Sequence, residues 1–357
     1  MNTEIRELVS KITEYSSRLG EVRLMEVCGT HTHEIHRLGI NRILPENIVT
    51  VSGPGCPVCV TDESDISAAM HIASIHDTIF CCYGDMLRVP CNGKSLDDLR
   101  SDGADVRIVL SSLDSLEIAR NNPFRQVVFF GIGFETTAPA TAVLIKKAAE
   151  ENVRNISVLC THKTMPKAIT ALLCGNNSIN GLICPGHVAA ITGSRAFDFV
   201  PDKLNIPAAV SGFEAKSILS AVSALCQMLC EGRNECVNMY PSVVGEYGNS
   251  LAQSCIGDVF RPSDAVWRGL GIIEGSGLEI REEFASFDAL NRYEIPAFEG
   301  SKNNGCICAS VIKGISTPMQ CPNFGKSCTP VNPSGPCMVS SEGSCAAFYK
   351  YDFCREV

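Results

Sequence analysis

The chain has 357 residues, 45% of them hydrophobic and 19% charged, and its formal net charge is −9. This composition excludes a disordered chain, and the acidic balance argues against a nucleic-acid partner, which requires a basic face. No apolar run reaches the ~18 residues of a membrane span, and the charged N-terminal residues do not form a secretory signal, so we expect a cytoplasmic protein with no membrane partner.

The predicted secondary structure begins with an amphipathic helix over residues 2–19. Short β-branched runs, each followed by a turn and a helical pattern, then fall at 49–51, 78–80, 106–110, 127–130, 156–160, 181–184 and 208–210. Strands that alternate with helices predict parallel sheets and an α/β fold with two similar Rossmann-like domains. The expected boundaries are an N-terminal segment over 1–45, α/β domains over 46–150 and 151–240, and a remainder with a cysteine-rich domain over 241–357.

The first motif is Cys28-Gly29-Thr30-His31-Thr32-His33, which follows an apolar run and opens a helix. A helix N-terminus lowers the pKa of a cysteine, so we expect Cys28 to be a nucleophile or metal ligand. His31 is then a candidate for moving protons. A buried cysteine beside a histidine-rich cap is one alternative, and a zinc site is another; its ligands would be Cys28, His31, His33 and His36.

The second motif, Gly53-Pro54-Gly55-Cys56-Pro57-Val58-Cys59, follows a predicted strand and opens a helix. Two cysteines separated by two residues in that position are typical of thioredoxin-like redox sites. The pair can close a disulfide reversibly. We therefore predict that Cys56 and Cys59 are redox-active.

Two further motifs lie at predicted strand ends. Gly131-Ile132-Gly133-Phe134-Glu135-Thr136-Thr137 resembles an anion cradle, so its Gly133, Glu135, Thr136 and Thr137 are candidates for binding a phosphate such as that of ATP. A tight turn without a ligand is an equal interpretation. His187, in Cys184-Pro185-Gly186-His187, is a candidate acid, base or ligand, or a structural histidine.

The C-terminal region is rich in cysteine, in a chain with 20 cysteines overall. In a reducing compartment, clustered cysteines indicate metal or redox chemistry. An iron–sulfur cluster takes four cysteines, whereas zinc sites prefer close pairs, so the wide spacings favour a cluster. The candidate ligands are Cys306, Cys321, Cys328 and Cys345, with Cys308 and Cys337 as alternates.

Together these motifs resemble the HypD family of hydrogenase maturation proteins. The resemblance is carried, in family order, by Met25–Thr32, Ser52–Val60, Gly84–Pro90, Gly133–Ala142, Pro185–Val188, Cys328–Pro330 and Gly335–Gly343. It implies two α/β domains plus a third domain that carries a [4Fe–4S] cluster and is built from both chain ends. It also implies a scaffold that works with a HypC-like chaperone to assemble Fe(CN)₂CO. A HypE-like donor would supply cyanide as a thiocyanate, and the large subunit of [NiFe]-hydrogenase would receive the product.

The resemblance also implies residue roles. Cys28 would hold the iron, and Cys56 and Cys59 would pass electrons from the cluster. The cluster would be held by Cys306, Cys321, Cys328 and Cys345. The family often has Cys-Gly where this chain has Cys306-Ile307-Cys308, which leaves the first ligand open between Cys306 and Cys308. Two other functions fit the same residues: a cluster-dependent thiol–disulfide reductase of a protein partner, and a zinc-stabilised binding module.

Overall fold

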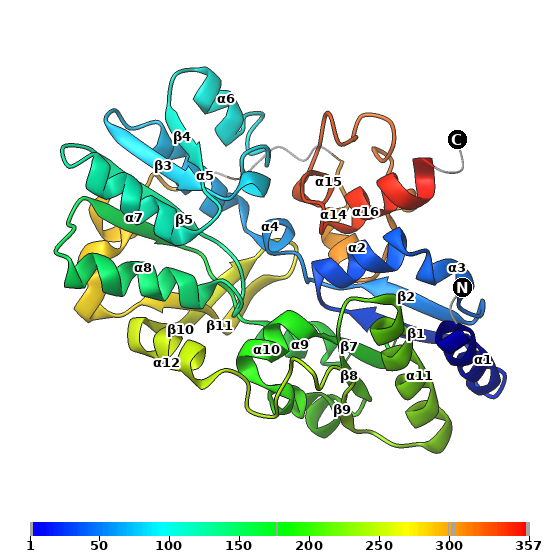
Figure 1. Cartoon of the computed structure of the whole chain (residues 1–357). Helices are drawn as coiled ribbons and strands as arrows, with labels where there is room; N and C mark the ends of the chain where they lie inside the picture. Colours follow the sequence, from blue (N-terminus) through cyan, green and yellow to red (C-terminus); the bar gives the residue numbers. More distant parts are fainter. Residues whose placement is uncertain (1–2, 176–177, 299, 301–304, 355–357) are drawn as a thin grey trace.

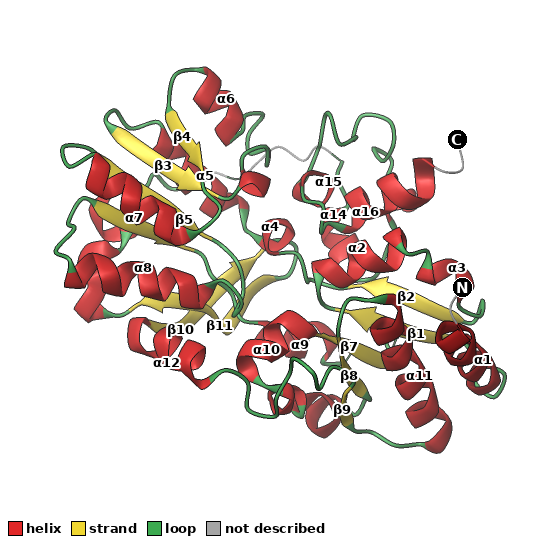
Figure 2. Ribbon diagram, viewed as in Figure 1, coloured by secondary structure: helices red, strands yellow, loops and turns green. Residues whose placement is uncertain are grey.

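A computed structural model describes residues 3–175, 178–298, 300 and 305–354 (Figure 1). Two parallel sheets, each flanked by helices, form the body of the molecule, and an antiparallel hairpin packs between them (Figure 2). The predicted α/β fold with two Rossmann-like units is therefore confirmed. None of the helices in the described ranges is long and apolar enough to cross a membrane.

The larger sheet has five parallel strands in the order β2-β1-β7-β8-β9. Their bounds are β1 (Val22–Glu26), β2 (Ile48–Ser52), β7 (Gly181–Pro185), β8 (Ala208–Ser211) and β9 (Cys236–Asn238). Its helices are α1 (Thr3–Ser16), α2 (Gly29–Arg37), α3 (Ile40–Ile43), α10 (Gly186–Thr192) and α11 (Ala215–Glu231). The apolar faces of α1 and α11 pack together over this sheet, because each helix repeats apolar residues at helical spacing.

The smaller sheet has four parallel strands in the order β4-β3-β5-β6. Its strands are β3 (Thr78–Cys82), β4 (Asp105–Ile108), β5 (Gln126–Gly131) and β6 (Ile156–Cys160). Its helices are α5 (Glu63–Ala73), α6 (Leu96–Ser101), α7 (Ser112–Asn121) and α8 (Ala138–Glu150), with α9 (Met165–Leu173), α12 (Ser250–Val259) and α13 (Ala289–Arg292) nearby. Counted within each sheet, the first four strands of both units stand in the order 2-1-3-4, and the larger sheet adds β9 at its edge, so the two folds share this topology.

Sheet membership differs from the predicted chain segments. Strands β1 and β2, on either side of the expected boundary at residue 45, pair with each other, and β1 also pairs with β7. Strand β6, expected in the second unit, pairs with β5 of the first. The smaller sheet is thus inserted between β2 and β7 of the larger one. Local patterning could not reveal this, because tertiary pairing decides which sheet a strand joins.

The hairpin of β10 (Phe260–Trp267) and β11 (Gly271–Ile280) follows these units, and the loop-rich C-terminal segment comes last. That segment contains α14 (Cys308–Ile312), α15 (Pro336–Val339) and α16 (Ser344–Phe348), followed by one π-helical turn over Tyr349–Phe353. Helix α16 packs against α2, and α15 packs against the short α4 (Pro57–Val60) (Figure 1). The C-terminal segment therefore lies beside the loops that follow β1 and β2.

Candidate metal and redox site

Cys28 lies at the carboxyl end of β1, where it is the residue that caps the N-terminus of α2. Strand β1 lies at the topological switch point of the larger sheet, because β2 is its neighbour on one side and β7 on the other. Ligands usually bind at such switch points in doubly wound folds. The thiol is buried, and burial together with the nearby Glu342 raises its pKa to about 12. The expected lowering of this pKa is therefore wrong, because burial outweighs the helix N-terminus.

The last residue of β1, Glu26, has a fully buried carboxyl beside Cys28. Its Oε1 accepts a hydrogen bond from Thr32 Oγ1 at 2.5 Å, and its Oε2 accepts one from the Cys28 amide at 3.2 Å. Burial raises the pKa of Glu26 to about 8. The Glu26 carboxyl is thus largely protonated at neutral pH, so it adds no buried negative charge beside the thiol.

The Cys56–Cys59 pair lies in the next loop, at the carboxyl end of β2, and forms a disulfide in the structure. Cys56 caps α4, and its Sγ accepts a hydrogen bond from the Cys59 amide at 3.1 Å. The preceding glycines let this loop lie directly on the β1–α2 turn. Gly29 donates to the carbonyl of Gly55 at 3.0 Å, and a Cβ on Gly55 would lie 2.2 Å from the Cys28 nitrogen.

His31 and His187 flank one aromatic ring at the same edge of the larger sheet. Phe213 stacks on His187 with ring centroids 3.9 Å apart, and it lies tilted against His31 with ring centroids 4.6 Å apart. The buried His31 Nε2 donates to the carbonyl of Gly212 at 2.9 Å, which leaves the Nδ1 lone pair without a partner in the described ranges. Burial lowers the pKa of His31 to about 4, so the ring is neutral at neutral pH.

The other two histidines of α2 face the C-terminal segment. His33 Nδ1 lies 2.9 Å from the carbonyl of Ser341, and His36 pairs with Asp352. The rings of His33 and His36 therefore contact the C-terminal segment, whereas the ring of His31 contacts Gly212. These three rings do not converge on Cys28. No group of three or more His, Cys, Asp or Glu side chains among the described residues is arranged to hold a single metal ion. The alternative of a zinc site on Cys28 and these histidines is therefore not supported.

Six cysteines of the C-terminal segment converge on one pocket: Cys306, Cys308, Cys321, Cys328, Cys337 and Cys345. Apolar side chains such as Val311, Phe324 and Met338 complete its walls. The thiols of Cys308 and Cys337 lie in contact, with their sulfur atoms 2.8 Å apart. A buried pocket lined by more than four thiols is a donor set that fits an iron–sulfur cluster.

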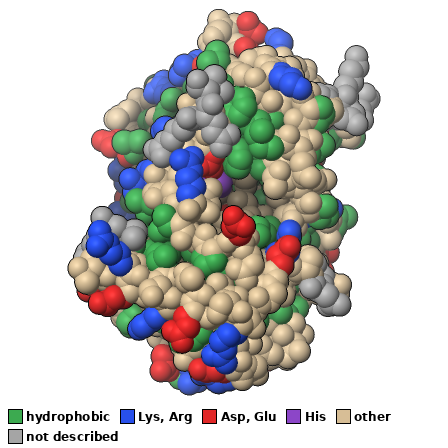
Figure 3. All heavy atoms as spheres, turned by 90° about the vertical axis from the view of Figure 1, so that its right-hand side faces the viewer, with side chains coloured by type: hydrophobic (Ala, Val, Ile, Leu, Met, Phe, Trp, Pro, Cys, Tyr) green, Lys and Arg blue, Asp and Glu red, His purple; other side chains and the backbone are tan. Residues whose placement is uncertain are grey.

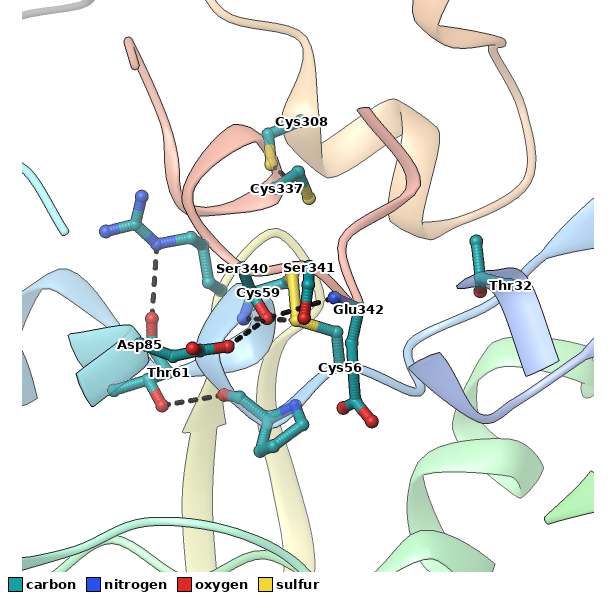
Figure 4. Close-up of a disulfide and its surroundings, with 12 residues drawn as sticks. Thr32, Cys56, Cys59, Thr61, Asp85, Cys308, Cys337, Ser340, Ser341 and Glu342 are labelled. Atoms are coloured by element: carbon teal, nitrogen blue, oxygen red, sulfur yellow. Dashed lines mark hydrogen bonds between the residues drawn. A yellow bond between two sulfur atoms is a disulfide. The ribbon is translucent and has the colours of Figure 1, made fainter. Parts of the chain in front are cut away.

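The segment from Ser340 to Glu342 connects this pocket with the Cys28 loop. Ser340 follows the α15 helix of Cys337, and its hydroxyl donates to Asp85 at 2.7 Å. Glu342 accepts a hydrogen bond from Thr30 Oγ1 at 2.6 Å. Figure 4 shows Cys308 and Cys337 beyond this segment, with the disulfide beside it. Thiol pocket, disulfide and Cys28 therefore form one continuous region of the molecule.

Comparison with known proteins decides the family. The HypD model, described as "Hydrogenase formation hypA family", matches residues 3–352. The chain belongs to the HypD family. Hydrogenase maturation factor HypD of Azotobacter vinelandii is 42% identical, covering 97% of this chain and 93% of that protein. The HypD proteins of Rhodobacter capsulatus and Escherichia coli K12 are 41% and 40% identical, each covering 98% of this chain and 95% of the relative.

The glycine-rich turn of this HypD-family chain is closed by its own side chains. Gly133 has a φ of +129°, and a Cβ there would lie 1.8 Å from Thr137 Oγ1. That hydroxyl donates to the carbonyl of Ile132 at 3.0 Å, while Thr136 is exposed. Glu135 is buried and accepts from the Met165 amide at 3.0 Å. These contacts favour the tight-turn interpretation, and ATP binding stays a prediction.

Sequence reasoning assigned no role to several residues of the site. The sequence could have indicated Glu26, since it is a lone acidic residue within an apolar strand, Leu24-Met25-Glu26-Val27. Nothing in the sequence pattern indicates Glu342 or Phe213, because only the folded chain brings them against α2. The convergence of Cys337 with Cys308 could likewise not be read from spacings of 28 intervening residues.

Proposed function

We propose that this chain is a hydrogenase maturation factor that acts as an iron–sulfur redox scaffold. With a HypC-like chaperone it would assemble the Fe(CN)₂CO group, take cyanide from a HypE-like donor, and deliver the product toward the hydrogenase large subunit. The observation that carries this proposal is the contact of the Gly55–Cys59 loop with Cys28, next to a pocket of six thiols. Soft donors and a redox pair thus lie in one region.

In this proposal Cys28 holds the iron that is being assembled, as a substrate. Low-spin iron with cyanide and CO favours a soft thiolate donor. Because burial keeps the Cys28 thiol protonated, binding of the cation must displace that proton. The neutral ring of His31 lies three residues away on α2, its Nδ1 has no partner among the described residues, and it is our candidate to relay that proton.

The Cys56–Cys59 pair would provide the electrons that release cyanide. Cleavage of a thiocyanate, R–S–CN, consumes two electrons and one proton and yields R–SH and cyanide. The reduced pair supplies both electrons as its two S–H bonds are replaced by one S–S bond. Of the two protons released, one goes to R–S and one to solvent. The disulfide of the structure is then the spent form of the pair.

The pair must be reduced again for each cyanide, and this requires a donor in the interior. Cys321, Cys328 and Cys345, together with one or more of Cys306, Cys308 and Cys337, would hold a [4Fe–4S] cluster. When bound, such a cluster supplies single electrons taken from an external low-potential donor. The packing of α15 against α4 supports this, because it brings the six-thiol pocket beside the helix of the disulfide.

The role of Cys28 is tested by infrared spectroscopy of the complex with the HypC-like partner. Cys28→Ala is expected to keep its iron and sulfide content and to lose the cyanide and CO bands. Cys226→Ala is the matched control, since Cys226 is a buried cysteine of α11 that packs in the core of the larger sheet and does not line the six-thiol pocket. Full cyanide and CO bands in Cys28→Ala would contradict the proposal.

A further inference from the structure

A groove lies on the surface of the C-terminal segment, next to the six-thiol pocket. It is formed by α15, α16 and the π-helical turn Tyr349–Phe353, and His33 of α2 also lines it. Its volume is about 400 Å³, so it accepts only a few side chains of a partner. The walls are mainly apolar and include Pro330, Met338, Val339, Ala346, Ala347 and Tyr349.

The groove and the six-thiol pocket share a wall. Met338, which follows Cys337 on α15, lines both of them and is only 2% exposed. Tyr349 lines the groove, and its ring packs edge-on against Phe324 of the thiol pocket with ring centroids 5.8 Å apart. A molecule seated in the groove is therefore separated from the thiol pocket by these side chains alone.

Two exposed cations stand at this groove, Arg88 and Lys350. Arg88 Nη2 donates to the carbonyl of Pro330 at 2.5 Å, and Lys350 Nζ lies 5.1 Å from the ring centroid of Tyr351. Neither cation pairs with a carboxylate in the part of the chain that the structure describes, and no described Asp or Glu lines the groove. In a chain with a net charge of −9, the groove is thus a local basic surface that favours an acidic partner.

We propose that this groove is the docking site of a small acidic one-electron carrier protein that reduces the iron–sulfur centre. This inference rests on the proposed function, which requires an external electron donor. In each encounter the carrier is oxidised by one electron and the centre is reduced by one. Two encounters supply the two electrons that convert the Cys56–Cys59 disulfide into two thiols, and the two protons come from solvent.

The form of the groove suits such a carrier. Redox partners meet through small contacts, because each carrier must leave again after it has passed its electron. A small apolar groove with unpaired cations beside it provides a contact of this kind. Opposite charges on the carrier steer its approach, and added salt weakens that attraction.

Stopped-flow mixing with a reduced plant-type ferredoxin, used as the acidic carrier, tests the inference. The chain is purified without oxygen, and visible absorption follows its reduction. At low salt, Lys350→Glu should lower the second-order rate constant roughly tenfold, and Arg88→Gln should lower it less. Lys216→Glu is the control, because Lys216 is an exposed lysine of α11, and it should react like the wild type. Added salt should slow the wild type and narrow its difference from Lys350→Glu.

Calorimetric titration with oxidised ferredoxin measures the docking without electron transfer. The dissociation constant should rise roughly tenfold in Lys350→Glu and stay unchanged in Lys216→Glu. This measurement decides the matter even if a variant loses its centre. Complete reduction by excess dithionite shows that the centre of each variant is intact.

The outcomes separate the inference from the function on which it rests. A wild-type chain without iron and sulfide would remove both. A wild-type centre that ferredoxin does not reduce, or equal rates and dissociation constants in the wild type and Lys350→Glu, would overturn the inference alone. If Lys350→Glu weakens binding of the HypC-like chaperone and leaves ferredoxin binding unchanged, the groove belongs to the chaperone and the inference is overturned.

Discussion

Glu26 and Cys28 lie two residues apart at the end of β1, and burial raises the pKa of both groups, to about 8 and about 12. At neutral pH both of these groups are therefore uncharged before iron arrives. This is what a buried site requires, since an unpaired carboxylate or thiolate in the interior is costly. A bound metal cation shifts Cys28 from thiol to thiolate, because it stabilises the negative charge of the sulfur directly.

The buried Glu26 predicts a pH dependence of stability. Its folded pKa, about 8, exceeds the ordinary 4.5, so its contribution to stability is fully present below pH 4.5 and is lost as the pH rises toward 8. In Glu26→Gln this loss disappears, while the amide group still can bond to Thr32 and to the Cys28 amide. Between pH 5 and 8 the free energy of unfolding of the wild type should fall relative to Glu26→Gln, by on the order of 1 kcal/mol per pH unit at most.

Urea unfolding of both proteins at several pH values measures this difference. Glu7→Gln, on an exposed position of α1, serves as control and should follow the wild type at each pH. Parallel pH profiles for the wild type and Glu26→Gln would mean that Glu26 is already ionised in the folded chain.

The contacts within the pocket also rank two ligand candidates. Cys308 is buried at the start of α14 and touches Cys337, whereas Cys306 is half-buried. We predict that Cys308→Ser reduces the iron content of the purified chain to less than about half, because a missing thiolate ligand weakens metal binding. Cys306→Ser should retain most of its iron. The reverse order would make Cys306 the ligand, as the sequence spacing alone suggested.

At the scale of elements, close backbone contact between two loops is what brings Cys28 to the disulfide. Gly53 donates to the carbonyl of Glu26 at 2.7 Å, and Gly55 lies against the Cys28 backbone. Neither position has room for a side chain, since a Cβ on Gly53 would lie 2.9 Å from the Glu26 carbonyl oxygen. The glycines of this loop therefore serve the approach of β2 and α4 to α2.

This contact predicts the effect of a single methyl group. Gly55→Ala should lower the free energy of unfolding by about 1–3 kcal/mol, the usual cost of overpacking. Gly20→Ala is the control, because a Cβ on Gly20 has nothing within 4 Å. Thermal or urea unfolding compares the two, and equal stability of both variants would show that the loops separate freely.

At the scale of the whole molecule, the fold class could be predicted from the sequence and the domain plan could not. Alternation of β-branched runs with helical patterns is local, so the parallel strands were predictable, as was the helix that follows Cys56. The insertion of the smaller sheet between β2 and β7 depends on long-range pairing, as does the meeting of Glu342 with Thr30. The lowered pKa expected for Cys28 failed for a related reason, because burial is set by the whole fold.

In the folded molecule α2, which follows the first strand, lies against α16 of the C-terminal segment, and Arg42 pairs with Asp352 at 2.7 Å. On the side that carries the termini, acidic and basic side chains are interspersed (Figure 3). The C-terminal segment thus forms the six-thiol pocket and packs against both the disulfide helix and the helix that Cys28 caps. Loss of a metal centre from this segment would therefore loosen the packing of all three parts.

The most direct test of the central claim is the content of iron, acid-labile sulfide and zinc in the chain purified without oxygen. The six-thiol pocket predicts about four irons and four sulfides per chain, without zinc. One zinc per chain with no sulfide would contradict the claim, because it would remove the internal source of electrons on which the proposed chemistry of Cys56, Cys59 and Cys28 depends.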